Sequence, residues 1–446
     1  MNRTLSADTP KKVGEIVKLN GWVNVRRNMG KIVFLDLRDR WGIVQVVCVP
    51  SEIDEPSRDA LKDIRPEFVL EIEGVVQDRN EEQVNEKLET GKIEVLAKKI
   101  KIFSAVSSEL PIAVVEKNTE EADLQKRLDW RWIDLRKPKN ILIFKVWTLM
   151  EQAFREYWTS NDYIEIHSPK FMGAPSEGSA ELFEVKYFDR KAYLAQSPQF
   201  YKQMAMASGF EKVFEVGPVF RANPSFTPRH DTEFTGYDME ISFIESHQDI
   251  INEEQKAIQY VLGKIKEKFG EEILSVFGRD LIVPTIPFPQ ITMKQAKEIL
   301  AKLKVPDERE GDLSPEEERK LSDYIKEKEG YEFVFVTEYP VNVRPFYHMR
   351  LEGDQKITKS FDLLWNGLEI TTGAQREHRY NVLVAQAKEK GLKLKLIQFY
   401  LNFFKYGCPP HGGLGLGPSR MLMKIFNIDN VREVTYLYCG IKRLEP

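Results

Sequence analysis

Cysteine is scarce in this chain, and no pattern pairs the residues that are present. The 446 residues include Cys48, Cys408 and Cys439, none of them in a CxxC pair. Scattered cysteines are typical of a reducing compartment rather than of a disulfide or zinc framework, so we expect a cytoplasmic protein. The six histidines form no HExxH motif, and zinc held by protein side chains is not expected.

Long apolar runs and phosphate-binding glycine loops are also missing. No segment approaches the roughly 18 apolar residues of a membrane span, and the polar start MNRTLSADTPKKVGE does not resemble a signal peptide. Neither GxGxxG nor GxxxxGK[ST] occurs. A nucleotide would therefore have to be held by arginines on strands. The net charge of −4 gives no overall attraction to nucleic acid, but it is compatible with a local basic face.

The first hundred residues read as a small β-barrel. Strands are expected at 16–25, 32–39, 43–49, 69–77 and 92–96, with a short helix at 57–64 between the third and the fourth. This order matches the five-stranded OB barrel, which binds single-stranded nucleic acid by stacking bases in a basic groove. Phe34, Gln45, Arg26 and Arg27 would form the base-reading face, although Phe34 by its alternation fits a core position equally well.

The rest of the chain reads as a second domain that mixes long helices with antiparallel strands. A linker at 105–138 is followed by an amphipathic helix at 139–162, by a helix at 246–269 and by a charged helical excursion near 306–330. We expect irregular structure at 271–290, a strand at 343–351 and a glycine-rich turn in PPHGGLGLGPSR. The predicted fold class is α+β, because no βαβ repeat is present.

One stretch, from Ala195 to Glu240, carries more charge than a hairpin needs in order to fold. Helix-forming residues with Lys202 precede a strand that ends at Arg221, and a loop with Arg229 and His230 precedes a run with Glu233, Asp238 and Glu240. This mixture of charges predicts a ligand that has both anionic and cationic groups.

The motifs around this stretch resemble those of the class II aminoacyl-tRNA synthetases. FRAN, RH and DME match motif 2, TTGAQR and GLGPSR follow in the order of motif 3, and YIEIHSP is similar to motif 1. With the OB barrel, the chain resembles the aspartyl, asparaginyl and lysyl subgroup over essentially its whole length. AQSPQFYKQ, DTEFTGYDME, KSFDLLWNGLEITTGAQR and YGCPPHGGLGLG follow the pattern of the aspartyl members. The catalytic half is similar to the archaeal type, without the bacterial insertion.

The resemblance implies three parts and one activity. Residues 1–104 would be the OB anticodon-binding domain, 105–138 a hinge and 139–446 the class II catalytic domain. The activity implied is ATP-dependent attachment of L-aspartate to tRNA-Asp through aspartyl-adenylate, with tRNA-Asn left open as a second substrate. The family also implies a homodimer formed through motif 1, with Pro169 at the interface, and no membrane partner.

The resemblance assigns roles to individual residues. Arg221 would brace the α-phosphate of ATP and the attacking carboxylate, and Arg420 would hold the γ-phosphate. Mg²⁺ would be held by Glu369 and Thr372. The other residues implied at the ATP site are Asn223, Arg229, His230, Asp231 and Gly417. In the barrel, the anticodon would be read by Arg26, Phe34, Gln45 and Glu94.

The resemblance also implies how aspartate is chosen. Arg376 would pair with the side-chain carboxylate, Lys202 would add a second positive charge, and Asp238 would lock this basic pair. Glu177 would take the substrate ammonium, with Gln199, Thr372 and Arg221 also at the amino-acid site. Two buried cations facing the amide of asparagine would stay unpaired, at a cost of roughly several kcal/mol. Asparaginyl relatives usually have an apolar residue where Lys202 stands.

Three departures and three alternatives accompany this hypothesis. Asn223 and Ser419 stand where relatives usually have Glu, and Tyr438-Cys439-Gly440 replaces a usual Pro-Arg-Asp. An asparaginyl-tRNA synthetase is the nearest alternative, and Lys202 speaks against it. A synthetase-like ligase that makes asparagine would not need the OB barrel. A non-catalytic OB nucleic-acid binder would not need Arg221, Glu369 and Arg420.

Overall fold

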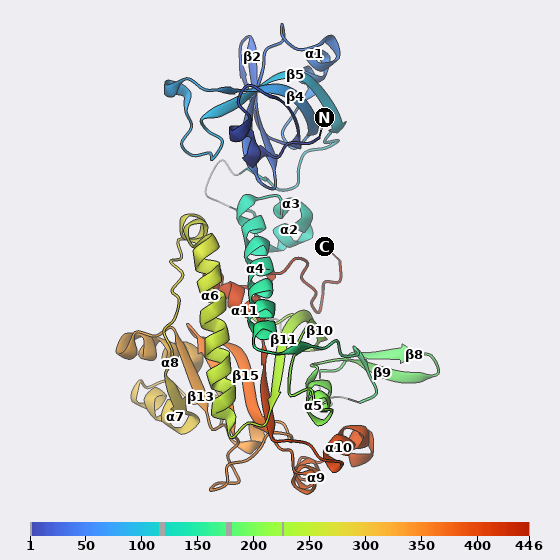
Figure 1. Cartoon of the computed structure of the whole chain (residues 1–446), viewed down its shortest axis with the longest axis vertical. Coiled ribbons are helices and arrows are strands. Elements are labelled where there is room, and N and C mark those ends of the chain that lie inside the picture. Colours follow the sequence, from blue (N-terminus) through green and yellow to red (C-terminus); the bar gives the residue numbers. More distant parts are fainter. Residues whose placement is uncertain (1, 116–120, 175–180, 225–226, 446) are drawn as a thin grey trace. The chain divides into compact units, whose positions relative to one another are not determined.

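The computed structural model describes residues 2–115, 121–174, 181–224 and 227–445. The chain divides into two compact units, Met1–Ile141 and Leu142–Pro446 (Figure 1). The domain boundaries predicted at 104 and 138 stay predictions. Among the described helices, none combines the length and the apolar character that crossing a membrane requires.

The first unit is built on a closed barrel with strand order β1-β2-β3-β5-β4, which confirms the OB prediction. The strands are β1 (Ile16–Met29), β2 (Ile32–Asp39), β3 (Gly42–Cys48), β4 (Val69–Asp78) and β5 (Ile93–Ser104), and helix α1 (Glu55–Asp63) lies between β3 and β4 in the chain. Alternate residues such as Val33, Leu35 and Leu37 fill the barrel. Phe34 lies on the outer face and is half-buried, so it is not a core residue.

Short helices complete this unit. They are η1 (Ser6–Lys12), η2 (Glu81–Gln83), α2 (Leu124–Asp129) and α3 (Arg131–Asp134). The carboxylate of Asp134 is fully buried and pairs with Arg131 at 2.8 Å and Lys137 at 3.1 Å. Such pairing is what allows a buried charge to persist.

The second unit is organised around an eight-stranded sheet in the order β12-β13-β14-β15-β16-β11-β10-β6. The strands are β6 (Ile164–Glu165), β10 (Lys212–Phe220), β11 (Glu233–Ser242), β12 (Gln290–Thr292), β13 (Phe333–Thr337), β14 (Ser360–Trp365), β15 (Leu368–Arg376) and β16 (His411–Leu416). All neighbouring pairs are antiparallel except β12 with β13 and β10 with β6. A small sheet, β7-β9-β8, is formed by Phe171–Met172, Arg190–Leu194 and Glu184–Tyr187.

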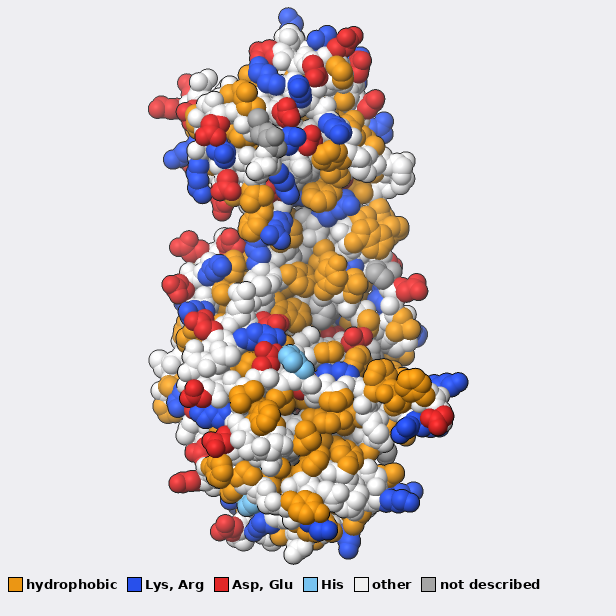
Figure 2. Space-filling model, turned by 45° about the vertical axis from the view of Figure 1, so that its right-hand side comes forward, with side chains coloured by type: hydrophobic (Ala, Val, Ile, Leu, Met, Phe, Trp, Pro, Cys, Tyr) orange, Lys and Arg blue, Asp and Glu red, His pale blue; other side chains and the backbone are white. Residues whose placement is uncertain are grey.

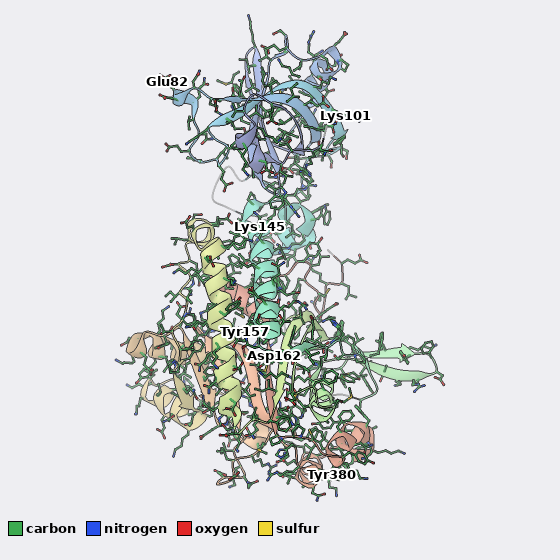
Figure 3. All side chains as sticks on the ribbon, viewed as in Figure 1. Glu82, Lys101, Lys145, Tyr157, Asp162 and Tyr380 are labelled. Carbon is green, nitrogen blue, oxygen red and sulfur yellow. The ribbon has the colours of Figure 1, made fainter. Side chains whose placement is uncertain are left out.

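Two long helices, α4 (Pro138–Ser160) and α6 (His247–Phe277), lie side by side along one face of this sheet (Figure 1). Tyr157 of α4 packs against Tyr260 of α6 with ring centroids 5.7 Å apart (Figure 3). The main core lies between these helices and the sheet, and it includes Trp158, Phe214, Tyr237 and Ile258.

Helix α6 is longer than the sequence predicted. It begins with a capping box formed by Ser246 and Asp249 and ends at Gly278, whose φ is 67°. The irregular structure expected from residue 271 therefore starts only after Phe277. The physical reason is that Ile273 is fully buried in the core, so tertiary packing extends the helix.

Smaller helices surround the sheet. They are α5 (Gln199–Ala207), α7 (Met293–Lys302), α8 (Pro315–Glu329), α9 (Tyr380–Glu389), α10 (Gln398–Lys405), α11 (Pro418–Phe426) and α12 (Val431–Val434), with η3 (Val341–Val343) and η4 (Leu394–Ile397). Helix α8 belongs to the excursion predicted near 306–330. It buries Leu321 and Ile325 in a satellite core with α7 and β13, while its charged face stays exposed.

Two local predictions are wrong. Residues 343–351 form no regular strand; they make isolated bridges, such as the one between His348 and Arg376, because Pro345 has no amide hydrogen to donate to a ladder. The glycine-rich segment is not simply a turn, because residues 411–416 form strand β16 between β15 and β11. Packing between two strands outweighs the low intrinsic strand propensity of glycine.

One acidic side chain lies inside the main core. Glu254 of α6 is 3% exposed. Burial raises the pKa of Glu254 to about 8, and the Thr371 hydroxyl opposes this only in part. This carboxyl group is on the helix that packs against β15, and β15 carries part of the site described next.

Candidate active site

A cavity of about 360 Å³ opens in the second unit. Its walls come from β10, β11, β15 and β16, with contributions from α5 and the start of α11. The predicted residues that line it are Gln199, Lys202, Arg221, Asn223, Arg229, His230, Asp231, Asp238, Glu369, Thr372, Arg376, Gly417 and Arg420. Glu177, predicted to take the substrate ammonium, lies outside the described residues.

At one end of the cavity, two buried cations are each paired with a carboxylate. Lys202 Nζ donates to Asp238 Oδ1 at 2.8 Å and to the Leu414 carbonyl at 2.8 Å, and lies 3.4 Å from Glu240 Oε2. Arg376 donates to Glu240 Oε1 from Nε at 3.0 Å. Burial by itself would raise the pKa of Glu240, but Arg376 and Lys202 outweigh it, and the pKa is lowered.

This pairing corrects one expectation. The resemblance implied that Asp238 would lock the basic pair and that both cations would stay unpaired opposite an asparagine amide. In the structure Lys202 pairs with Asp238, and Arg376 pairs with Glu240, a partner that the sequence did not suggest. The reason is that buried charges are retained in proteins when they are paired. A substrate with an anionic side chain must then be selected by the charge balance of the cavity and not by unpaired cations.

The glycines of β16 make the pairing between strands possible. β16 lies between β15, which carries Arg376, and β11, which carries Glu240. A Cβ atom on Gly413 would collide with the Met239 carbonyl and the Glu240 carboxylate. Arg376 instead crosses this position and donates from Nη2 to the Gly413 carbonyl at 2.9 Å. The absence of a side chain therefore lets an arginine and a glutamate meet across an intervening strand.

A chain of hydrogen bonds extends from Gln199 beside Lys202 to His411 at the start of β16. Gln199 Nε2 and the Tyr400 hydroxyl both donate to Gln203 Oε1, at 2.9 and 3.0 Å. Gln203 Nε2 donates to His411 Nε2 at 2.9 Å, and His411 Nδ1 donates to the Pro409 carbonyl at 2.8 Å. Burial lowers the pKa of His411 to about 4, which keeps the ring neutral and allows this arrangement.

The other end of the cavity carries the remaining arginines. Arg420 is the third residue of α11, and its Nη1 donates to the Glu369 carbonyl at 2.8 Å and lies 3.2 Å from Glu369 Oε1. Arg221 stands just after β10, and its guanidinium carbon is 5.5 Å from the centre of the Phe234 ring. Arg229 is bound to Glu318 of α8 at 2.5 Å.

Burial also affects two other titratable residues that line the cavity. Burial lowers the pKa of His230, and Arg420 and Arg221 lower it further, so the ring is neutral. Burial raises the pKa of Asp231 to about 7, with Arg432 and Arg420 opposing the shift. Neither carboxylate oxygen of Asp231 has a hydrogen-bond partner among the residues that the structure describes.

A metal ion would find few protein ligands here. Among the residues that the structure describes, no group of three or more acidic, histidine or cysteine side chains is arranged to hold one. The Thr372 hydroxyl donates to Glu369 Oε1 at 3.3 Å, which places two oxygen ligands together. One carboxylate and one hydroxyl fit Mg²⁺ that keeps most of its coordination for phosphates and water.

Several residues of the cavity carried no predicted role. Phe234 and Gly236 share one face of β11 with Asp238 and Glu240, and strand alternation in DTEFTGYDME would have identified them. Arg344 and His348 also line the cavity. Nothing in the local sequence indicates their positions, because the segment that carries them is not a regular strand.

The predicted anticodon residues lie in the first unit. Gln45 donates to Glu94 Oε2 at 2.9 Å and accepts from Arg27 at 3.0 Å, and Gln77 donates to Glu94 Oε1 at 2.9 Å. In the β-ladder, Phe34 stands opposite Arg27 of β1. Arg26 is half-buried in the same strand. Gln45, Gln77, Glu94 and Arg27 thus form a polar cluster on the face of the sheet that also carries the half-buried Phe34. Arg26 stands opposite the core residue Leu35 in the ladder, so the structure does not bring its side chain to this face.

Comparison with known proteins places the chain in a family. Residues 123–438 match the model for tRNA synthetases class II (D, K and N), and residues 17–103 match the OB-fold nucleic acid binding domain. The chain therefore belongs to the class II tRNA synthetases of the D, K and N group.

The similar proteins include both aspartyl and asparaginyl members. An aspartate–tRNA(Asp/Asn) ligase of Methanopyrus kandleri is 42% identical, with 98% of each chain covered. An aspartate–tRNA(Asp) ligase of Pyrococcus furiosus is 40% identical, with 97% of each covered. Among solved structures, asparaginyl-tRNA synthetase of Pyrococcus horikoshii with asparaginyl-adenylate has a TM-score of 0.91 at 32% identity, with both chains covered completely. Aspartyl tRNA synthetase of Entamoeba histolytica has a TM-score of 0.88 at 30% identity, covering 100% of this chain and 93% of that one.

Proposed function

We propose that the chain attaches L-aspartate to tRNA in an ATP-dependent reaction through aspartyl-adenylate. One observation carries this choice of amino acid: Lys202 and Arg376 lie buried together at one end of the cavity. At this end Lys202 pairs with Asp238 and Arg376 pairs with Glu240, and Arg221, which lines the same cavity, adds a third positive charge against the two negative ones. This excess of one positive charge complements aspartate, whose net charge is −1, better than neutral asparagine.

Positioning and charge account for the first step. The α-carboxylate of aspartate attacks the α-phosphorus of ATP, the bond to the β-phosphate oxygen breaks, and pyrophosphate leaves. Arg221 would bind the α-phosphate and the attacking carboxylate, and Arg420, at the start of α11, would bind the γ-phosphate. The Phe234 ring offers an apolar face for the adenine. Asn223, His230, Asp231 and Gly417 line the same end of the cavity, and Arg229 would have to leave Glu318 to reach a phosphate.

Glu369 and Thr372 would hold Mg²⁺ that enters with the nucleotide. When bound, Mg²⁺ supplies charge neutralisation for the phosphate oxygens. In the structure Glu369 is held by Arg420 and Thr372. These contacts keep its carboxylate beside Arg420, with 35% of the side chain exposed.

In the second step, the aspartyl group passes to the terminal ribose of tRNA. We propose that the barrel binds the anticodon, with Phe34 stacking on a base and with Gln45 and Glu94 making hydrogen bonds. The proposed substrate is tRNA-Asp, with tRNA-Asn as a second candidate, since relatives of both specificities are similar to this chain. Three free thiols favour a cytoplasmic location.

We further propose a homodimer. Figure 2 shows apolar side chains gathered on one face of the second unit. Ile164 in motif 1 is 48% exposed, Phe171 of the small sheet is 54% exposed, and Phe188 in the turn between β8 and β9 is 81% exposed. Pro169 is exposed between them in the chain. Large exposed apolar side chains of this kind mark a protein interface.

ATP–pyrophosphate exchange with aspartate and with asparagine, measured side by side, tests the choice of amino acid. We expect exchange with aspartate to exceed exchange with asparagine by at least about a hundredfold in kcat/KM. Exchange with asparagine alone would establish the asparaginyl alternative, and exchange with neither would refute the enzymatic proposal. Aspartylation of purified tRNA-Asp and tRNA-Asn then determines the tRNA range.

A further inference from the structure

His348 occupies a fixed position beside the end of β15. The Met349 amide donates to the Gln375 carbonyl at 3.0 Å, and the Glu377 amide donates to the Tyr347 carbonyl at 2.8 Å. On the other side, Gln386 Nε2 donates to the His348 carbonyl at 3.1 Å. These bonds hold the backbone on both sides of His348. The side chain is 3% exposed and lines the cavity.

The imidazole of His348 contacts the guanidinium of Arg376. His348 Nε2 lies 3.1 Å from Arg376 Nη1. A guanidinium has only donors, so Nε2 must accept this hydrogen bond and the ring proton must be on Nδ1. Burial lowers the pKa of His348 well below its usual range, and the nearby charges of Arg376, Arg344, Lys202 and Lys390 lower it further. A lowered pKa favours the neutral ring, which is the form that can accept the hydrogen bond from Arg376.

The contact completes a set of acceptors around Arg376. Glu240 accepts from Nε at 3.0 Å, the Gly413 carbonyl accepts from Nη2 at 2.9 Å, and His348 accepts from Nη1. Each of the three nitrogens of the planar Arg376 guanidinium thus donates to at least one fixed acceptor. Glu240 and Gly413 reach the guanidinium from the side of β11 and β16, and His348 reaches it from the opposite side of β15.

We propose that His348 is a positioning residue for the selection of the amino acid. It holds the guanidinium of Arg376 in the plane in which it meets the side-chain carboxylate of aspartate. A neutral acceptor suits this role because it adds no charge to the pocket, whereas a carboxylate at this position would cancel the excess positive charge. Holding the arginine in place before binding spares the substrate the cost of ordering it. This inference rests on the proposed role of Arg376.

Replacement of His348 by Gln, Leu and Ala tests the proposal in ATP–pyrophosphate exchange. In H348A and H348L the KM for aspartate is expected to rise on the order of 10- to 100-fold, with the KM for ATP unchanged within about threefold. H348Q should bring the KM for aspartate back to within about threefold of the wild type, because the Gln amide oxygen can accept the Nη1 hydrogen where Nε2 did. A purely structural role would affect both substrates and would not distinguish Gln from Leu.

The outcomes separate this inference from the proposed function. R376K serves as the reference, because a lysine cannot replace the planar guanidinium. A raised KM for aspartate in R376K, together with an unchanged KM in H348A and H348L, would overturn the role of His348 alone. An unchanged KM in R376K would overturn the role of Arg376 and with it the proposed choice of amino acid. Equal losses in H348Q and H348L, both folded by circular dichroism, would also refute the positioning role.

Discussion

Lys202 provides the sharpest test of how this site selects its substrate. Among the described residues, Lys202 donates to Asp238 Oδ1 at 2.8 Å, to the Leu414 carbonyl at 2.8 Å and to the Met239 carbonyl at 3.4 Å, and Glu240 Oε2 lies 3.4 Å away. The ammonium has three protons, and these acceptors use them. Lys202 therefore acts on the substrate through its charge and not through a direct hydrogen bond.

The magnitude follows from the separation of the charges. For the estimate we take a separation of roughly 6 Å between the Lys202 ammonium and a substrate carboxylate bound to Arg376. At an effective dielectric constant of about 20, a unit charge at this distance contributes about 3 kcal/mol, or about a hundredfold in affinity. K202M should therefore lower kcat/KM for aspartate about a hundredfold and change the value for asparagine much less.

K202M is also expected to destabilise the folded protein, so a second variant is needed to separate stability from substrate selection. It leaves Asp238, which is 8% exposed, without its cation, and loss of one partner of a buried pair costs about 3–5 kcal/mol. The double variant K202M/D238N removes both charges. The remaining Arg221 and Arg376 against Glu240 again give an excess of one positive charge.

ATP–pyrophosphate exchange and thermal unfolding of K202M and K202M/D238N test whether charge balance selects aspartate. If charge balance selects aspartate, the double variant regains stability and at least about tenfold of the lost aspartate kcat/KM. A double variant that folds like the wild type but activates aspartate as poorly as K202M would refute the electrostatic account and indicate direct contact with Lys202. A folded K202M with unchanged aspartate activation would refute any role for this charge.

Three further predictions concern other parts of the molecule. The pKa of Glu254 in the folded state is raised to about 8 from an ordinary 4.5, so the folded state loses stability as the pH rises from about 4.5 to 8. E254Q should abolish this loss: in urea titrations it should raise the free energy of unfolding at pH 8 by as much as about 4 kcal/mol relative to the wild type and change it little at pH 4.5. Equal effects at both pH values would contradict the prediction. G413A should raise the KM for aspartate at least about tenfold, because its Cβ would collide with the Glu240 carboxylate. G415A is the milder control, because its Cβ would lie 3.2 Å from Asp238 Oδ1. Equal effects of the two variants would argue against the crossing of β16 by Arg376. Q45A should raise the KM for tRNA about tenfold in aspartylation and leave pyrophosphate exchange unchanged; a loss of exchange would show that the barrel variant is misfolded.

Much of the fold followed from local patterns. The barrel strands alternate strictly, as Val33, Leu35 and Leu37 show, so their spacing predicted both the strands and their inward faces. Helix α4 was predicted within two residues at each end, because its apolar residues recur at helical spacing and Pro138 marks its start. The end of α6 was missed because burial of Ile273 carries that helix beyond the predicted boundary.

Some residues of the site were predicted from the sequence, and others were found only in the structure. Motif spacing, through the resemblance, indicated Lys202, Arg221, Arg376 and Arg420, and all four line one cavity. His348 was missed because the segment that carries it is irregular, and its contact with Arg376 is made across 28 positions of the chain. No local pattern reports a contact of that kind.

The sequence alone determined the kinds of side chain available for the chemistry: arginines without a phosphate loop, one carboxylate and one hydroxyl for Mg²⁺, and buried lysine and arginine beside acidic residues. Only the tertiary structure decided how these charges are paired. Strand order brings β11, β16 and β15 side by side, and the glycines of β16 let Arg376 reach Glu240. The physical reason is that hydrophobic spacing specifies which face of a strand is buried, whereas the partner of a buried charge depends on which strands become neighbours.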